Sequence, residues 1–297
     1  MIKESIKPIC LLSVIIVSYN SLKYIKGCLK SIFTYNDIGD SLEVIVVDNS
    51  PGYETKRWID KSCYDVVTIE NANRGFGEAN NVGAKNANGK YLLFLNPDTE
   101  LLEPVFSFAI NRFQTNPDLG CFGVQLVDEK GRNNYSFGLR NNRGFILTLT
   151  DKLLSFFNLF ISRFMFISGA NIFIEKTVFE DCGMFDENIF LYYEESDLCN
   201  RLILKGKINK FFPEKKILHY EGKASEKTLF NSYAYALESR EYYCKKFGLN
   251  FEEEIRKELR YCKFKILFFN LLNNKTRRLE YYKIVNLLNK KLGLNRG

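Results

Sequence analysis

The feature that most constrains the fold is a regular alternation of apolar runs and helical segments in the first 116 residues. Four runs have the apolar, β-branched composition of strands buried on both faces, at residues 12–18, 43–48, 66–69 and 91–95. Apolar residues at helical spacing separate or follow them, at residues 22–33, 78–88 and 103–116. This order predicts an α/β fold with a mostly parallel sheet and helices on both faces.

The second half of the chain is less regular. An apolar, aromatic-rich stretch covers residues 145–168, and a strand (171–174), a helix and an acidic segment follow it. A short strand is expected at residues 216–219, and from about residue 225 onward the pattern is helical. We therefore expect one domain over residues 1–225 and a helical C-terminal extension over residues 226–297.

The distribution of charges and cysteines narrows the class of protein. The net charge is +7; residues 251–297 carry 12 Lys and Arg against 5 Asp and Glu, whereas the first 250 residues balance at 30 against 30. The eight cysteines are scattered singly, which fits neither a zinc site nor a disulfide framework and predicts reduced thiols in a cytoplasmic protein. We expect no signal peptide in the first ten residues and no spanning helix, because charges interrupt residues 145–167.

Polar side chains follow three of the expected strands. They are Ser18, Tyr19 and Asn20 after the first, Asp48 at the end of the second, and Asn96, Pro97 and Asp98 after the fourth. Open sheets of this kind bind ligands at the carboxyl ends of their strands, so these residues are candidates for a site. Ser, Asn and Asp also favour helix caps and turns, and that explanation stays open for each of them.

A glycine-containing segment joins the third and fourth strands. It includes Asn73, Arg74, Gly75 and Asn80. Glycine lets the backbone approach a ligand closely, and an arginine beside it can meet a phosphate. Asn80 occupies the third glycine position of a G-x-G-x-x-G fingerprint, and no Walker phosphate loop is present. Neither an NAD site nor a Walker ATP site is therefore expected.

Two further places carry groups suited to chemistry. Glu194, Glu195 and Asp197 directly follow aromatic residues, and crowded carboxylates beside apolar surface can have the raised pKa of a general base. The alternative is an acidic first helical turn that complements the helix dipole. His219, the chain's only histidine, ends a short strand. A lone histidine is more often structural, but an Asp–His pair from two strand ends could hold Mg²⁺ or Mn²⁺.

Five segments in this order resemble the inverting, metal-dependent glycosyltransferases of family 2, and most closely their bacterial rhamnosyltransferase-like members. The segments are residues 17–20, 46–50, 73–80, 95–99 and 190–199, the last followed by His219. Each segment alone is a weak signal, but their order, with strands where the family has them, is specific. The resemblance covers roughly residues 11–225 and implies the GT-A fold, with a Rossmann-like nucleotide-sugar half over about 11–100 and an acceptor half over about 101–225.

The resemblance also implies roles for single residues. The nucleotide would be bound by Ser18, Tyr19, Asn20, Asp48, Asn73, Arg74, Gly75, Asn80, Asn96 and Pro97, with Asp48 on a pyrimidine base. The donor-sugar and acceptor cleft would be lined by Ser168, Gly169 and Ala170. Asp98 and His219 would hold Mg²⁺ or Mn²⁺. Glu195 would be the catalytic base, with Glu194 as second choice and Asp197 as a further catalytic candidate.

The activity implied is transfer of a sugar to a glycan or lipid-linked hydroxyl in bacterial surface polysaccharide synthesis, with inversion by one base and one displacement. dTDP-rhamnose is the first candidate donor, and UDP-linked hexoses stay open. Asn96 stands where many relatives have a carboxylate, and Glu195 stands where Asp is usual. These departures leave a catalytically silent nucleotide-sugar or glycan-binding protein as the alternative. A sugar-phosphate nucleotidyltransferase is disfavoured, because residues 18–21 lack the glycine-rich loop of that class.

Basic and aromatic residues interleave in the tail. A basic helix with aromatic faces fits an anionic membrane surface, and a solvated cap or a dimer contact is an equal alternative. We expect a cytoplasmic protein that is peripheral on the inner face of the cell membrane if the tail binds lipid. No recognised motif predicts nucleic-acid binding.

Overall fold

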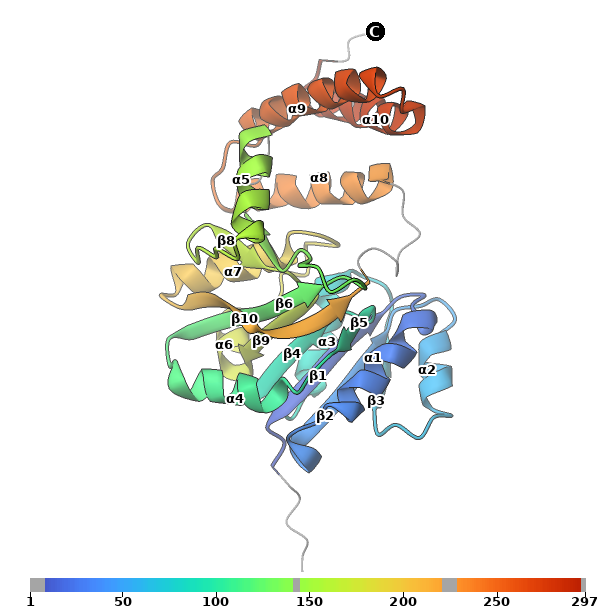
Figure 1. The fold of residues 1–297 in the computed structure, drawn as a ribbon, viewed down its shortest axis with the longest axis vertical. Coiled ribbons are helices and arrows are strands. Elements are labelled where there is room, and N and C mark those ends of the chain that lie inside the picture. The colour runs from blue at the N-terminus through green and yellow to red at the C-terminus, as the bar shows by residue number, and fades with distance from the viewer. Residues whose placement is uncertain (1–8, 141–144, 221–228, 295–297) are drawn as a thin grey trace, which may run out of the picture.

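The computed structural model describes residues 9–140, 145–220 and 229–294 (Figure 1). An eight-stranded sheet lies at its centre, in the order β3-β2-β1-β4-β9-β6-β10-β5. Four neighbouring strands are parallel: β1 (Leu12–Ser18), β2 (Leu42–Asp48), β3 (Val67–Glu70) and β4 (Tyr91–Leu95). The prediction of a mostly parallel α/β sheet is confirmed, and the carboxyl ends of these strands meet at one edge.

The other half of the sheet is mixed. Its strands are β5 (Thr99–Leu101), β6 (Leu119–Val127), β9 (Asn171–Glu175) and β10 (Ile208–His219). β9 runs antiparallel between β4 and β6, while β10 is parallel to β6 and antiparallel to β5. The sequence did not reveal β5 or β6, and it predicted only the last third of β10. β7 (Phe137–Leu139) and β8 (Met165–Ile167) form a separate antiparallel ribbon.

Helices cover both faces of the sheet because the side chains of each strand alternate between them. Val14 and Ile16 of β1 pack in one core with α1 and α4, whereas Ile15 and Val17 pack in a second core with α3, α6 and α7. The helices are α1 (Leu22–Thr34), a 3₁₀ turn (Gly39–Ser41), α2 (Glu54–Ile59), α3 (Phe76–Asn86), α4 (Phe106–Thr115), α5 (Phe145–Phe156), α6 (Lys176–Asp181) and α7 (Glu194–Leu204).

The C-terminal extension is helical, as predicted, and has a core of its own. It consists of α8 (Leu229–Lys246), α9 (Phe251–Leu271) and α10 (Lys275–Lys291). Leu237 of α8, Ile255 and Leu259 of α9, and Ile284 and Leu288 of α10 form that core. In Figure 1 α8 lies next to the sheet domain and α9 and α10 lie beyond it.

Two predictions concern residues outside the described ranges. One is the domain boundary between residues 225 and 226, and the other is the expectation of no signal peptide before residue 9. Within the residues that the structure describes, no helix is long and apolar enough to cross a bilayer. The apolar stretch at 145–168 instead contributes α5 and β8.

Candidate active site

Hydrogen bonds join the carboxyl ends of β1 and β2. The Asn49 amide donates to the Ser18 carbonyl (2.8 Å), and the Asn20 amide donates to the Ser50 hydroxyl (2.9 Å). The Ser18 side chain is fully buried and its hydroxyl lies 2.7 Å from that of Thr55, so it stabilises the start of α2. Tyr19 is 42% exposed at this edge, where its ring is available to a ligand.

Asp48 holds the loop between β2 and α2. Its carboxylate is fully buried; one oxygen accepts from the Ser50 amide (3.0 Å) and the other from the Lys56 amide (2.9 Å). These bonds give Asp48 the turn-forming role that its residue type favours. Contact of Asp48 with a pyrimidine base stays a prediction.

A backbone hydrogen bond joins the segment before α3 to the segment before α7. The amide of Phe76 donates to the carbonyl of Phe190 (3.0 Å). Gly75 has φ +126°, and a Cβ at this position would lie 2.6 Å from the same carbonyl oxygen. Asn73 and Arg74 are exposed beside this contact, whereas Asn80 is buried and donates to the Phe76 carbonyl inside α3. The expected nucleotide-binding loop therefore presents the Arg74 guanidinium and the Asn73 amide to solvent.

The structure brings Asp98 and His219 together, as the resemblance implied. Asp98 lies between β4 and β5, and the pairing of Thr99 with His219 brings the end of β10 beside it. The Tyr220 amide donates to the Asp98 carbonyl (2.9 Å), and Nε2 of His219 lies 3.5 Å from Oδ1 of Asp98. Both side chains are at most 10% exposed.

The chemistry of this pair fits a divalent ion shared with a ligand. Nδ1 of His219 is buried without a hydrogen-bond partner. No group of three His, Cys, Asp or Glu side chains suited to a metal gathers anywhere in the described ranges. An ion such as Mn²⁺ needs about six ligands, so phosphate oxygens of a substrate would have to supply what Asp98 and His219 do not. We conclude that the pair fits such a joint site and does not form a closed cage.

The segment 168–170 connects this pair to Glu195. The Asn96 amide donates to the Ala170 carbonyl (3.1 Å), because β9 begins opposite the end of β4. A Cβ on Gly169 would lie 2.1 Å from Oε1 of Glu195, so glycine is required for this approach. Burial raises the pKa of Glu195, while the backbone amides of Glu195 and Gly169 lower it. The predicted cleft segment and the predicted base are therefore in contact.

The two other acids of α7 have different surroundings. Glu194 is 1% exposed, and its Cγ lies 3.4 Å from where a Cβ on Gly77 would be. Asp197 is fully buried and pairs with Arg201 (2.6 Å) and with Lys246 of α8 (2.5 Å). Its contacts are those of a residue that holds α7 in place, and we do not include it among the proposed reacting groups.

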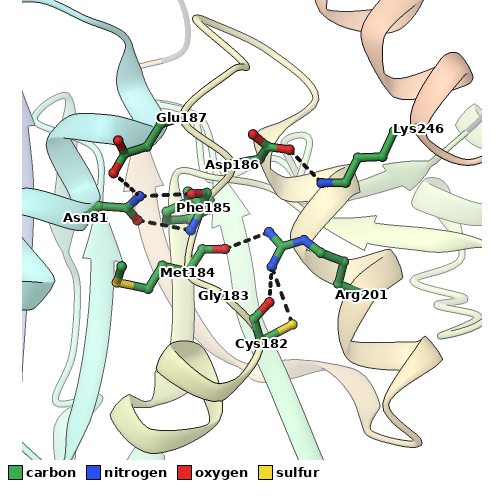
Figure 2. Close-up of a pocket in the computed structure, with 9 residues that line it drawn as sticks. All are labelled: Asn81, Cys182, Gly183, Met184, Phe185, Asp186, Glu187, Arg201 and Lys246. Atoms are coloured by element: carbon green, nitrogen blue, oxygen red, sulfur yellow. Dashed lines mark hydrogen bonds and ion pairs between the residues drawn. The ribbon is translucent and has the colours of Figure 1, made fainter.

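A cluster of polar residues next to α7 was not predicted from the sequence. Asn81 of α3 donates to the carbonyl of Phe185 (2.9 Å) and accepts from its amide (3.0 Å) (Figure 2). Asn81, Asp186, Arg201 and Lys246 line a cavity of about 410 Å³ here. None of the predicted nucleotide residues lines it, so it is separate from the site at the strand ends. The one signal in the sequence was a second asparagine on the buried face of α3.

The sequence of residues 13–182, more than half of the chain, matches the family model for glycosyl transferase family 2. The chain belongs to this family. It is 30% identical over 197 residues to an uncharacterized glycosyltransferase of Rickettsia prowazekii, covering 63% of this chain and 57% of that relative. It is 24% identical to the rhamnosyltransferase WbbL of Escherichia coli K12, covering 70% and 82%. The matched region is thus little more than half of the Rickettsia relative's length.

A solved structure gives the fold independently. The mannosyltransferase PcManGT of Pyrobaculum calidifontis, in complex with GDP-Man and Mn²⁺, superposes with a TM-score of 0.55 at 16% identity, covering 77% of this chain and 61% of that one. The predicted GT-A fold is therefore confirmed, and the chain is a family 2 glycosyltransferase.

Proposed function

We propose that this glycosyltransferase moves one sugar from a nucleotide diphosphate to a hydroxyl of a glycan or lipid-linked acceptor, with inversion, in synthesis of a bacterial surface polysaccharide. One observation carries the proposal: Asn96, two residues before Asp98, donates to the carbonyl of Ala170, and the neighbouring Gly169 contacts Glu195. This link supports a single site with a group that can stabilise a leaving diphosphate and a group that can accept a proton.

Glu195 is the proposed base. Its raised pKa means that the carboxylate holds a proton more tightly than an exposed glutamate does, which suits acceptance of the acceptor's hydroxyl proton. The Gly169 amide orients the carboxylate. Glu194 packs against Gly77 of α3. One base that takes the proton of the acceptor hydroxyl is sufficient for a single displacement and therefore for inversion, whereas retention by double displacement needs a carboxylate nucleophile at the reacting carbon.

Asp98 and His219 would hold Mg²⁺ or Mn²⁺. When bound, such an ion neutralises the charge that develops on the departing diphosphate. Arg74 is exposed next to Gly75 and can place its guanidinium against a phosphate. Asn96 supplies a neutral side chain where a third ligand could stand, so we expect modest metal affinity in the absence of nucleotide.

The donor and its nucleotide are inferred from relatives. Similarity to a rhamnosyltransferase supports rhamnose, and hence dTDP-rhamnose, as the first donor to test. UDP-linked hexoses remain the alternative, and the GDP-Man complex of the structural neighbour adds GDP to the panel. Nucleic acid is not among the proposed ligands.

The test of the nucleotide and metal site is thermal unfolding with dTDP, UDP and GDP, each with and without Mn²⁺. A ligand that binds only the folded state stabilises it by about 2.7 kcal/mol at a hundredfold excess over its Kd. We expect a metal-dependent rise in Tm with one nucleotide, and its loss in Asp98→Ala. If no nucleotide raises the Tm of the wild type, the proposed donor site is wrong.

The test of the base compares Glu195→Gln with Glu194→Gln. Gln keeps the shape of Glu195 but accepts no proton, so transfer should fall by about 10²–10⁴-fold while nucleotide binding persists. Glu194→Gln is the matched control and should retain most of the activity. A larger loss in Glu194→Gln would reassign the base to Glu194.

We also propose that the protein is cytoplasmic and binds the inner face of the cell membrane through α9. Phe264, Leu267, Phe268 and Leu271 are 42–77% exposed and lie on one face of this helix. Lys265 lies between them in the sequence and Lys263 directly before them, and such a basic, apolar face suits an anionic lipid surface. This location would bring the site close to a lipid-linked acceptor.

A further inference from the structure

The segment that carries the proposed base has an unusual backbone. Residues 186–197, here called the base segment, lead from β9 and α6 into α7. Tyr192 and Tyr193 both have positive φ, +68° and +76°, immediately before the helix begins at Glu194. Two consecutive large residues in the left-handed region are disfavoured, so contacts from elsewhere must hold this conformation.

Helix α8 of the C-terminal extension supplies those contacts. The buried hydroxyl of Ser239 donates to the carbonyl of Leu191 (2.8 Å), next to the two strained tyrosines. The ring of Tyr243 packs on Tyr193 and that of Tyr235 on Phe190, with centroids 5.4 Å apart in both pairs. Tyr235, Ser239 and Tyr243 follow one another at four-residue spacing, so one face of α8 contacts the base segment over successive helical turns.

A charged contact fixes the two ends of the base segment to the same helix. Lys246, near the end of α8, donates to Asp186 (2.6 Å) and to Asp197 (2.5 Å). Figure 2 shows Lys246 extending from its helix toward Asp186. Burial opposes ionisation of Asp186, but Lys246, Asn188 and the Tyr242 hydroxyl together lower its pKa to about 2. Lys246 therefore joins two carboxylates that lie on either side of Glu195 in the chain.

The base segment also contacts the loop before α3, residues 73–76, here called the nucleotide loop. The Phe190 carbonyl accepts from the Phe76 amide, and Gly75 leaves room for it. The base segment is therefore held between this loop and α8. A shift of α8 would move Glu195 relative to Gly169, whereas the loop contact would still hold Phe190.

We propose that α8 positions the catalytic base, with Ser239 and Lys246 as its positioning residues. The inference rests on the proposed function, because it assigns Glu195 the role of base. It gives the C-terminal extension a part in the reaction, in addition to any role in location. Misplacement of a reacting group by about 1 Å can cost on the order of 10²-fold in rate. Loss of one contact between α8 and the base segment should therefore lower kcat.

The first experiment removes the Ser239 hydroxyl without changing charge. In Ser239→Ala we expect kcat to fall about tenfold while the donor KM stays the same. A displaced Glu195 would be less buried, so the acid limb of the pH–rate profile should move to lower pH. Its ionisable neighbours on α7, Glu194 and the paired Asp197, are unchanged by this variant. Ser239→Thr keeps the hydroxyl and should restore both kcat and the limb.

The second experiment removes the charged contact. Lys246→Met should lower kcat by about tenfold or more, and Lys246→Arg should recover part of it, because guanidinium can pair with both carboxylates. Lys291→Met is the matched control. It removes a pair with Glu241 that joins α10 to the same helix α8 but does not touch the base segment. The control should leave kcat and the acid limb unchanged.

Hydrogen–deuterium exchange separates failure of this inference from failure of the proposed function. Residues 186–193 should exchange faster in Ser239→Ala and Lys246→Met than in the wild type and Lys291→Met, without any substrate. Unchanged exchange in both variants would show that Ser239 and Lys246 do not hold the base segment in place, whatever the activity. Faster exchange with unchanged kcat and acid limb would overturn the positioning role. A wild type without transfer to any donor would count against the proposed function alone.

Discussion

At Glu195 the structure couples proton affinity to fold stability. Burial raises the pKa of this carboxyl above its ordinary value of 4.5, and the amides of Glu195 and Gly169 oppose the rise. Because the folded pKa lies above the unfolded one, the stabilising contribution of Glu195 is fully present below the unfolded pKa. It is lost as pH rises through the folded pKa. The ionised form that the proposed mechanism needs is therefore the form that the fold tolerates less well.

This coupling predicts the pH dependence of Glu195→Gln. Gln is neutral throughout, so the Tm of the variant relative to the wild type should increase as pH rises above about 4.5 and then level off. Glu253→Gln is the matched control, because Lys257 lowers the pKa of the exposed Glu253 and the difference should have the opposite sign. Scanning calorimetry between about pH 4 and pH 8 measures both. A Glu195 difference that does not change with pH would contradict a pKa raised by burial of this carboxyl.

Single residues of the site were predictable to different degrees. Asp98 and His219 were paired through a family resemblance, but their contact depends on the pairing of β5 with β10, which the sequence did not reveal. The family resemblance implies that Asp48 contacts a pyrimidine base, whereas its residue type alone favours the turn that it forms. Lys246 could not have been predicted, because only the fold brings it to an acid 49 residues away.

At the scale of elements, the contact between the nucleotide loop and the base segment depends on Gly75. Its φ of +126° and ψ of 166° lie in a region that essentially only glycine occupies. Gly75→Ala should therefore cost about 1–3 kcal/mol in unfolding free energy, plus the cost of moving Phe190, and should weaken nucleotide binding. Urea unfolding and nucleotide titration measure the two effects.

The control for Gly75→Ala is Gly206→Ala. Gly206 also has a positive φ, +79°, but a Cβ there would meet nothing within 4 Å. Its cost should be limited to backbone strain, about 1–2 kcal/mol, and nucleotide binding should not change. Equal nucleotide affinity in the two variants would show that the Gly75–Phe190 contact does not shape the donor site.

The elements that the sequence predicted share a physical property. β1, β2 and β4 are buried on both faces, so their apolar runs are continuous and easy to recognise. β10 was largely missed, because a Pro, a Glu and several lysines interrupt it, and its register shifts between Phe212 and Lys216. β5 has three residues, which is too short for a periodic signal.

Helix α8 is joined to α9 by a buried ion pair. Arg240 lies 2.5 Å from Glu258, and the two side chains are 3% and 7% exposed. Removal of one partner leaves a buried charge, so Arg240→Met should destabilise the extension by about 3–5 kcal/mol, and adding Glu258→Leu should recover most of this. Denaturant unfolding followed by circular dichroism measures the effect, and Lys257→Met, which breaks exposed pairs, should change little. No recovery in the double variant would refute this account.

At the scale of the whole molecule, α9 lies beyond α8, away from the sheet (Figure 1). The inner face of the same helix packs in the core of the extension through Ile255, Leu259 and Cys262. Phe264, Leu267, Phe268 and Leu271 continue the helix and are 42–77% exposed. These exposed apolar side chains and the basic excess of residues 251–297 support the proposed binding of α9 to an anionic surface.

Binding to vesicles tests this assignment. Wild type should pellet with vesicles containing about one third anionic lipid at low salt, and less so at about 0.5 M salt, because screening weakens the lysine contribution. Leu267→Ser with Leu271→Ser should reduce binding at least about tenfold, since each buried leucine contributes about 1.5–3 kcal/mol. Leu102→Ser, on an exposed leucine beside β5, is the control and should bind like wild type. Wild type that stays in the supernatant at low salt would exclude the membrane surface and leave a protein contact or a solvated cap for this face of α9.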